Sequence, residues 1–156
     1  MKAKRPAEVD AFLQGRRIAV AGVSRQPNQP ANAILRRLRD LGHDVVALNP
    51  RASRLEGGPC YPDLRAVPGP IDGVVIATHP DSAAEVVRAC AEKGVGRVWF
   101  HRALGGGSVS AEALRECEAR GVEALMGGCP LMFCEPVDIC HRCLRWWLQL
   151  RGRVPR

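Results

Sequence analysis

The stretch from Arg16 to Leu41 constrains the fold most strongly, because it joins a buried strand to an amphipathic helix through a glycine turn. Ile18–Ala21 is a run of four apolar residues, which is typical of a strand covered on both faces. Gly22 ends this run, and Pro30 follows where the first turn of a helix tolerates proline. A strand that enters a helix through such a turn gathers free backbone N–H groups at the positive end of a helix dipole. This stretch therefore predicts an anion site, usually for phosphate.

The rest of the chain continues the alternation of apolar strands and helices, which predicts an α/β fold with helices on both faces of a parallel sheet. We expect a Rossmann-like open sheet of about five strands in a single domain. The predicted strands are Ile18–Ala21, Asp44–Leu48, Gly73–Ala77, Arg97–Phe100 and Val122–Met126. The helices are expected over 30–41, from Asp81 or Ser82 to Lys93, from Ser108 or Ser110 to Arg120, and over 137–150.

Three segments follow from this pattern. Residues 1–15 form a lead-in, in which a short helix over Val9–Gln14 covers one edge of the sheet. Residues 16–130 form the Rossmann-like domain, with a loop rich in glycine and proline after the second strand. Residues 131–156 form a helix and a basic tail that pack on the same domain. Trp146 and Trp147 are adjacent, so we expect one in the core and the other at an interface between copies of the chain.

The net charge of +7 favours polyanionic ligands. Much of this charge lies at the two ends of the chain, so we do not expect a nucleic-acid groove. Seven cysteines without a signal peptide predict a cytoplasmic protein with reduced thiols. No apolar stretch approaches the roughly 18 residues of a membrane span, so no membrane partner is expected.

Polar or glycine-rich loops follow each of the five predicted strands. Because the carboxyl ends of parallel strands meet at one rim of the sheet, we expect these loops to converge there on a nucleotide-type ligand. The loops are Gly22–Arg25, Asn49–Arg51, Thr78–Pro80, His101–Gly107 and Gly127–Pro130.

The loop after the second strand indicates which nucleotide. The dinucleotide fingerprint G-x-G-x-x-G is absent, and so is the P-loop motif. A carboxylate that binds ribose hydroxyls is usual after this strand, but here Asn49, Pro50 and Arg51 follow. An arginine attracts a phosphate that a carboxylate would repel. The predicted ligand therefore carries a phosphorylated ribose, as NADP and coenzyme A do.

Several of these segments, in this order, resemble a known family. They are Ile18 to Ser24, Asn28-Gln29-Pro30, Asn49-Pro50-Arg51 and Cys129-Pro130. Together they resemble the small stand-alone CoA-binding proteins, which are similar to the CoA-binding domains of succinyl-CoA synthetase and NDP-forming acyl-CoA ligases. The resemblance covers about Gly15 to Pro130. The family's usual Gly-Ala-Ser and Arg-Pro-Ser segments read Gly22-Val23-Ser24 and Gln29-Pro30-Ala31 here.

The resemblance implies coenzyme A as the cofactor. Gly22, Val23, Ser24 and Arg25 would hold the pyrophosphate, and Asn49, Pro50 and Arg51 the adenosine end with its ribose phosphate. Thr78, His79 and Pro80 would border the pantetheine. Asn28, Pro30, His101 and Cys129 complete the expected site. The larger ligases carry a catalytic histidine and a nucleotide-grasp module that this chain is too short to contain. We therefore expect a protein that binds CoA or acyl-CoA without catalysing a reaction itself, with a protein partner supplying catalysis.

Two other function classes remain open. An NADP-dependent oxidoreductase-like enzyme is the first, although no Tyr/Lys pair or substrate domain is evident. A thiol or metal regulator is the second, because Cys129, Cys134, Cys140 and Cys143 lie close in sequence to His141. Cys129 itself has two interpretations: a thiol whose pKa His79 or His101 lowers, or a small buried residue. Ser24 lies outside a G-x-S-x-G elbow and is not expected to be a nucleophile.

Overall fold

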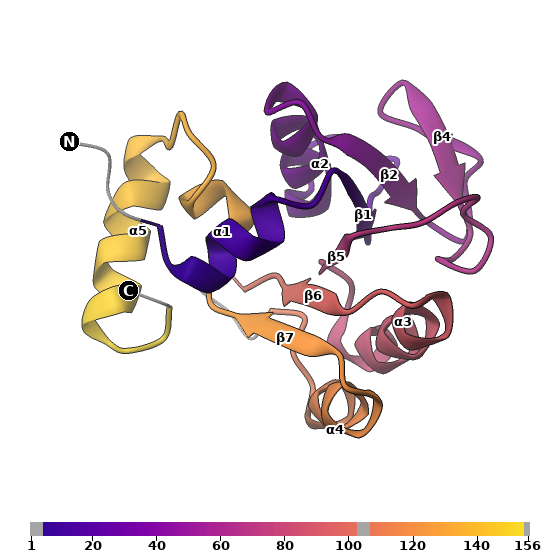
Figure 1. Ribbon diagram of the computed structural model, residues 1–156. Helices are drawn as coiled ribbons and strands as arrows, with labels where there is room; N and C mark the ends of the chain where they lie inside the picture. Colours follow the sequence, from indigo (N-terminus) through magenta and orange to yellow (C-terminus); the bar gives the residue numbers. More distant parts are fainter. Residues whose placement is uncertain (1–4, 103–106, 155–156) are drawn as a thin grey trace.

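Seven strands form one sheet in the order β3-β4-β2-β1-β5-β6-β7 in the computed structural model, which describes residues 5–102 and 107–154 (Figure 1). All neighbouring strands are parallel except β3 and β4, which are antiparallel. The strands are β1 Arg17–Ala21, β2 Asp44–Leu48, β3 Arg54–Leu55, β4 Gly58–Tyr61, β5 Gly73–Ile76, β6 Arg97–Phe100 and β7 Glu123–Met126. The helices are α1 Ala7–Leu13, α2 Pro30–Asp40, α3 Pro80–Lys93, α4 Ala111–Arg120 and α5 Ile139–Leu150, with a 3-10 helix η1 at Pro130–Met132. The Rossmann-like α/β prediction is thus confirmed.

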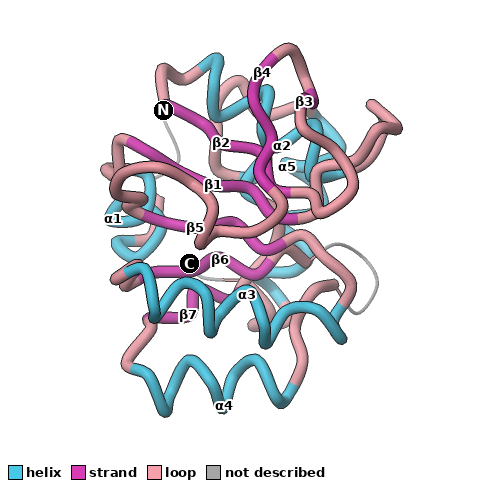
Figure 2. The backbone as a smooth tube through the Cα atoms, turned by 90° about the vertical axis from the view of Figure 1, so that its right-hand side faces the viewer, coloured by secondary structure: helices cyan, strands magenta, loops and turns pink. Residues whose placement is uncertain are grey.

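Helices cover both faces of the sheet. Helices α3 and α4 lie side by side on one face, and α1, α2, η1 and α5 lie on the other (Figures 1 and 2). Side chains alternate between the faces along each strand. In β1, Ile18 and Val20 belong to the core under α2, whereas Ala19 and Ala21 belong to the core under α3. The apolar runs in the sequence are therefore buried on both sides, as their composition predicted.

The sheet has two strands more than the five expected, because the glycine- and proline-rich loop contains the hairpin β3–β4. Glu56 occupies the hairpin turn with a positive φ of 50°. Its carboxylate accepts hydrogen bonds from the Asn32 side chain at 2.7 Å and from Arg36 at 2.8 Å, both on α2. Contacts between distant segments thus stabilise strands that local composition disfavours.

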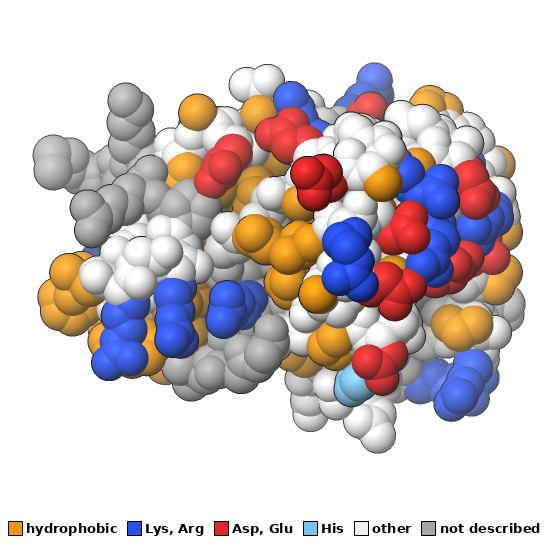
Figure 3. Space-filling view, turned by 90° about the horizontal axis from the view of Figure 1, so that it is seen from below, with side chains coloured by type: hydrophobic (Ala, Val, Ile, Leu, Met, Phe, Trp, Pro, Cys, Tyr) orange, Lys and Arg blue, Asp and Glu red, His pale blue; other side chains and the backbone are white. Residues whose placement is uncertain are grey.

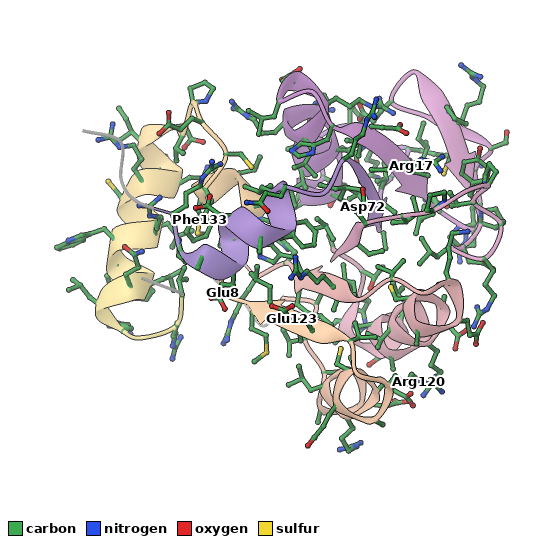
Figure 4. The ribbon with its side chains drawn as sticks, in the orientation of Figure 1. Glu8, Arg17, Asp72, Arg120, Glu123 and Phe133 are labelled. Atoms are coloured by element: carbon green, nitrogen blue, oxygen red, sulfur yellow. The ribbon has the colours of Figure 1, made fainter. Side chains whose placement is uncertain are left out.

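Helix α1 covers a face of the sheet. The sequence had predicted instead that this helix would cover an edge. Phe12 meets the ring of Trp99 edge-on, with the ring centroids 5.4 Å apart. A side chain at Gly73 would place its Cβ 2.8 Å from the Phe12 ring, so the glycine makes room for this contact. The buried aromatic cluster continues to Phe133, which lies beside α5 in Figure 4.

Helix α5 differs from its prediction in what it buries. Trp146 and Trp147 are 65% and 36% exposed, so the expectation of a core tryptophan is wrong. Leu148 is buried instead. Helix α5 also packs against η1, and beside η1 the Arg145 guanidinium lies over the Phe133 ring.

The amino ends of the strands lie on the side of the sheet opposite the predicted ligand rim. There the Asp72 carboxylate accepts the N–H groups of Arg16 and Arg17, both at 2.8 Å (Figure 4). At the carboxyl ends of the strands, Ser110 caps α4 as expected. Helix α3 is capped by His79 in place of Asp81 or Ser82. Within the described residues, no helix has the length and apolar character needed to cross a membrane.

Candidate functional site

A cavity of about 460 Å³ opens where the carboxyl ends of β1, β2 and β5 meet α3 and the segment after β4. This volume lies within the range of roughly 300–1,000 Å³ that small-molecule sites occupy. Most of the lining is apolar. The lining residues are Ala21, Gly22, Leu48, Asn49, Pro50, Pro62, Asp63, Leu64, Arg65, Thr78, Asp81, Ser82, Glu85, Val86 and Ala89.

Four of the residues predicted from the sequence line this cavity: Gly22, Asn49, Pro50 and Thr78. They come from three neighbouring strand ends in the observed order β2-β1-β5. The expected convergence of loops therefore takes place over β2, β1 and β5. The remaining predicted residues lie around the mouth of the cavity or farther along the rim, as the following paragraphs describe.

Gly22 holds the turn after β1 tightly between the two neighbouring strands. Its φ is +97°, and a Cβ built on it would lie 2.4 Å from the Ala77 carbonyl oxygen. Its N–H donates to the Leu48 carbonyl at 3.3 Å. Glycine is therefore required here by the packing of the chain itself, whether or not a ligand is present.

Asn32, in the first turn of α2, orders the rest of this loop. Its side chain is buried, accepts the Ser24 N–H at 2.9 Å and donates to the Ser24 carbonyl at 2.8 Å. The amides of Gly22 and Ser24 are thus engaged within the protein, so backbone contacts from Gly22–Arg25 to a pyrophosphate cannot come from these two amides. Among the described residues, the amides of Val23 and Arg25 have no acceptor.

Asn49 joins the loop after β1 to the loop after β2. Its Nδ2 donates to the Val23 carbonyl at 2.7 Å, and its Oδ1 accepts the Arg51 N–H at 2.7 Å. The Arg25 guanidinium donates to the Arg51 carbonyl. The side-chain amide of Asn49 therefore orders the two loops, and Arg25 and Arg51 lie next to each other, both exposed.

Thr78 lines the cavity, and its side-chain hydroxyl has no hydrogen-bond partner among the described residues. The Oγ1 atom of this hydroxyl is buried. Buried hydroxyl groups in proteins almost always have a partner. An unpaired hydroxyl in the wall of a cavity fits a hydrogen bond to a bound molecule.

The acidic wall of the cavity was not predicted from the sequence. Asp63, Asp81 and Glu85 line it, together with one arginine, Arg65. Arg65 is 2.9 Å from Glu85 and is also paired with Glu92. Figure 3 shows basic and acidic side chains interspersed over this face of the molecule. The segment that carries Asp63 and Arg65 follows β4, and its place at the rim could have been found only by predicting that strand.

Four further predicted residues lie outside the cavity lining. Asn28 is exposed in the loop before α2, and Pro30 and Pro80 are the first residues of α2 and α3. His79 is exposed, and its Nδ1 accepts the Asp81 N–H at 3.4 Å as the cap of α3. These residues shape the helix starts next to the cavity.

His101 follows β6 and Cys129 follows β7, at the other end of the rim. The cavity does not extend to this end. Both are buried, and neither lines the cavity. Burial raises the pKa of Cys129 to about 12, which agrees with the interpretation of Cys129 as a small buried residue and not with that of an activated thiol. Burial, followed by the charge of His141, lowers the pKa of His101. Residues 103–106, part of the predicted His101–Gly107 loop, lie outside the described residues.

The burial of the thiols predicts a sharp difference in their reactivity. At pH 8 we expect iodoacetamide to label the exposed Cys140 and Cys143 and to leave Cys129 and Cys134 unlabelled, because the thiolate is the reactive form. Peptide mass spectrometry before and after unfolding in urea measures this directly. Rapid labelling of Cys129 in the folded chain would contradict its burial.

The C-terminal cysteines do not form one cluster. Cys129 and Cys134 are buried, whereas Cys140 and Cys143 are exposed on α5. Within residues 5–102 and 107–154, no three histidine, cysteine or carboxylate side chains are placed to hold a metal ion.

Comparisons with known proteins agree with this geometry. Residues 16–135 match the family model described as "CoA binding domain". Acetate–CoA ligase [ADP-forming] I of Archaeoglobus fulgidus is 32% identical over 78 residues, which are 50% of this chain and 11% of the ligase. The uncharacterised protein YneT of Bacillus subtilis is 26% identical over 79% of this chain and 89% of its own. The structure of a hypothetical protein from Pyrococcus horikoshii OT3 superposes with a TM-score of 0.76 at 26% identity, over 88% of this chain and 99% of that one.

Proposed function

Because this chain belongs to the CoA-binding domain family, we propose that it binds coenzyme A in the cavity at the carboxyl ends of β1, β2 and β5. The observation that carries this proposal is a cavity with mostly apolar lining next to two adjacent exposed arginines. Thr78, whose hydroxyl is unpaired, lines the cavity, and Arg51 directly follows the lining residue Pro50 and lies beside Arg25. A polyanionic cofactor with a long neutral arm requires both features.

The charges of the site set the direction in which the cofactor lies. Arg25 and Arg51 attract the pyrophosphate and the ribose phosphate to the mouth, where the amide of the exposed Arg25 has no acceptor among the described residues. Three carboxylates and one arginine lie exposed along one wall of the cavity, whereas its buried lining residues are apolar. The acidic wall disfavours phosphate, so we expect a neutral part of the cofactor to lie against the buried apolar residues. The Thr78 hydroxyl donates a hydrogen bond to that part or accepts one from it.

The proposed role is to hold and present the cofactor, without a bond being made or broken by this chain. The described residues that line the cavity include no cysteine, histidine or lysine. The activity of the ligases that this chain resembles in part would need residues supplied by a partner. The chain spans 11% of the Archaeoglobus ligase, which leaves room for such a division of labour.

A panel of ligands tests the proposal. A ligand that binds only the folded state raises the melting temperature, and saturation at about 100 times Kd adds about 2.7 kcal/mol of stability. We expect CoA and acetyl-CoA to give the largest shifts, dephospho-CoA a smaller one, and ADP and NADP less. A larger shift with NADP than with CoA would instead favour the oxidoreductase-like alternative.

Thr78→Val separates binding from folding. The substitution removes a hydroxyl that the empty protein leaves unpaired, so we expect the free energy of unfolding to stay the same or to rise by about 1 kcal/mol. CoA should bind about 5- to 10-fold more weakly, because its hydrogen bond is lost. Calorimetry and urea unfolding give the two numbers. Unchanged CoA affinity would place the cofactor away from Thr78.

A further inference from the structure

The outer face of α5 carries a regular apolar row that the domain does not use. Ile139, Cys143, Trp146 and Leu150 follow one another at intervals of four, three and four residues. All four are exposed, with Ile139, Trp146 and Leu150 at 75%, 65% and 61%. We refer to these four residues as the α5 seam. Its spacing is that of the a and d positions of a coiled coil.

The inner face of α5 is already occupied, so the seam is not needed to hold the helix in place. Leu148 is buried in the core, and Arg145 donates to the Met132 carbonyl at 3.2 Å. Asp138 caps the first turn through the His141 N–H at 2.9 Å. A helix of 12 residues is thus fixed to the domain, and the described part of the chain leaves its second face uncovered. Helix α5 also lies beyond residues 16–135, the part that matches the family model.

A hollow on the α5 seam has a shape that can accept one side chain of another helix. Ile139, Arg142, Cys143 and Trp146 surround a groove of about 400 Å³. These positions are i, i+3, i+4 and i+7, the four that form the hole for one knob of a facing helix. The hollow therefore fits a large apolar side chain on another α-helix better than it fits a flat surface.

The charge next to the seam selects the kind of helix. Arg142, Arg151 and Arg153 are exposed beside it, and Arg151 lies over the Trp147 ring at 4.1 Å. The segment Ile139–Leu150 contains no aspartate or glutamate. Two copies of α5 facing each other would bring arginines together with no carboxylate to pair them. A partner with glutamates beside its apolar row would pair them instead.

We propose that the α5 seam is the docking site for an acidic amphipathic α-helix of a partner protein. The helix places a leucine-like side chain in the hollow and carboxylates opposite Arg142 and Arg151. In Figure 1, α5 and α3 lie at opposite sides of the molecule, and α3 walls the cavity. The seam and the cavity can therefore be occupied at the same time, and this proposal does not depend on the proposed function.

Two designed peptides test the proposal on the full chain. Each has about four heptads with leucine at positions a and d. One carries glutamate at positions e and g, and its matched control carries lysine there. We expect calorimetry and Trp146 fluorescence to show binding of the glutamate peptide and none of the lysine peptide.

Three variants sharpen the result. Trp146→Ala should weaken the glutamate peptide by about 30-fold, as loss of a central tryptophan does at other interfaces. Arg142→Glu should weaken it by about 10-fold and allow the lysine peptide to bind. Leu41→Ala, at an exposed leucine 42% accessible just after α2, is the matched control and should change nothing. Circular dichroism checks that each variant is folded.

Several outcomes would overturn the proposal. Binding of neither peptide, or equal binding of both, would show that the seam does not select an acidic helix. Binding to vesicles of phosphatidylcholine and phosphatidylglycerol, without binding of the glutamate peptide, would identify an anionic membrane as the occupant. A dimer in sedimentation experiments that Trp146→Ala dissociates would identify a second copy of the chain.

Discussion

Gly22→Ala is expected to lower the free energy of unfolding by about 2–4 kcal/mol, the largest single effect that we predict for stability. The new Cβ would lie 2.4 Å from the Ala77 carbonyl oxygen and 2.7 Å from its carbon, both of which are backbone atoms of the neighbouring strand end. The residue must also keep a φ of +97°, which alanine rarely adopts. Relief requires β1 and β5 to separate at the mouth of the cavity, so CoA binding should fall as well. Urea unfolding and calorimetry measure the two effects.

Gly42→Ala is the matched control for this change. Gly42 also has a positive φ, of +91°, but a Cβ there would meet no atom within 4 Å. It should therefore show only the backbone cost, about 1 kcal/mol, and should leave CoA binding unchanged. Equal destabilisation by the two variants would mean that the contact with Ala77 is not what makes glycine necessary after β1.

Arg51→Ala is expected to weaken CoA by about 10- to 150-fold, since a hydrogen bond to a charged group contributes roughly 1.5–3 kcal/mol. Its guanidinium has no partner among residues 5–102 and 107–154, because the contacts of Arg51 to Asn49 and Arg25 use only its backbone N–H and carbonyl. Dephospho-CoA lacks the ribose phosphate that we assign to Arg51, so its affinity should stay almost the same. Calorimetric titration of both ligands gives the comparison.

Two neighbouring arginines make this prediction specific. Arg25→Ala should weaken CoA and dephospho-CoA alike, because both carry the pyrophosphate that we assign to Arg25. Arg54→Ala removes a nearby exposed charge on β3 and should change neither affinity by more than about twofold. Equal losses of CoA and dephospho-CoA in Arg51→Ala would refute the selection of the ribose phosphate by Arg51.

The sequence alone determined how β1, β2, β5, β6 and β7 alternate with helices along the chain, and the rim where their loops meet. These features depend on the spacing of apolar residues within a few positions, and on glycine and proline at the turns. Asp44–Leu48 and Arg97–Phe100 were predicted at their observed bounds, and Gly22, Asn49, Pro50 and Thr78 were predicted at the site that proves to contain the cavity. Family resemblance pointed to CoA for the same reason, because its motifs are these local turns.

Tertiary structure decided which of those groups are available to a ligand. The amide of Ser24 is taken by Asn32, and the side chain of Asn49 by the two loops that it joins, whereas Thr78 keeps an unpaired hydroxyl. The strand β4 that brings Asp63 to the cavity, and the outward turn of Trp146 on α5, also depend on contacts between distant segments. Burial and hydrogen-bond pairing are set by such neighbours in space, and local spacing carries no record of them.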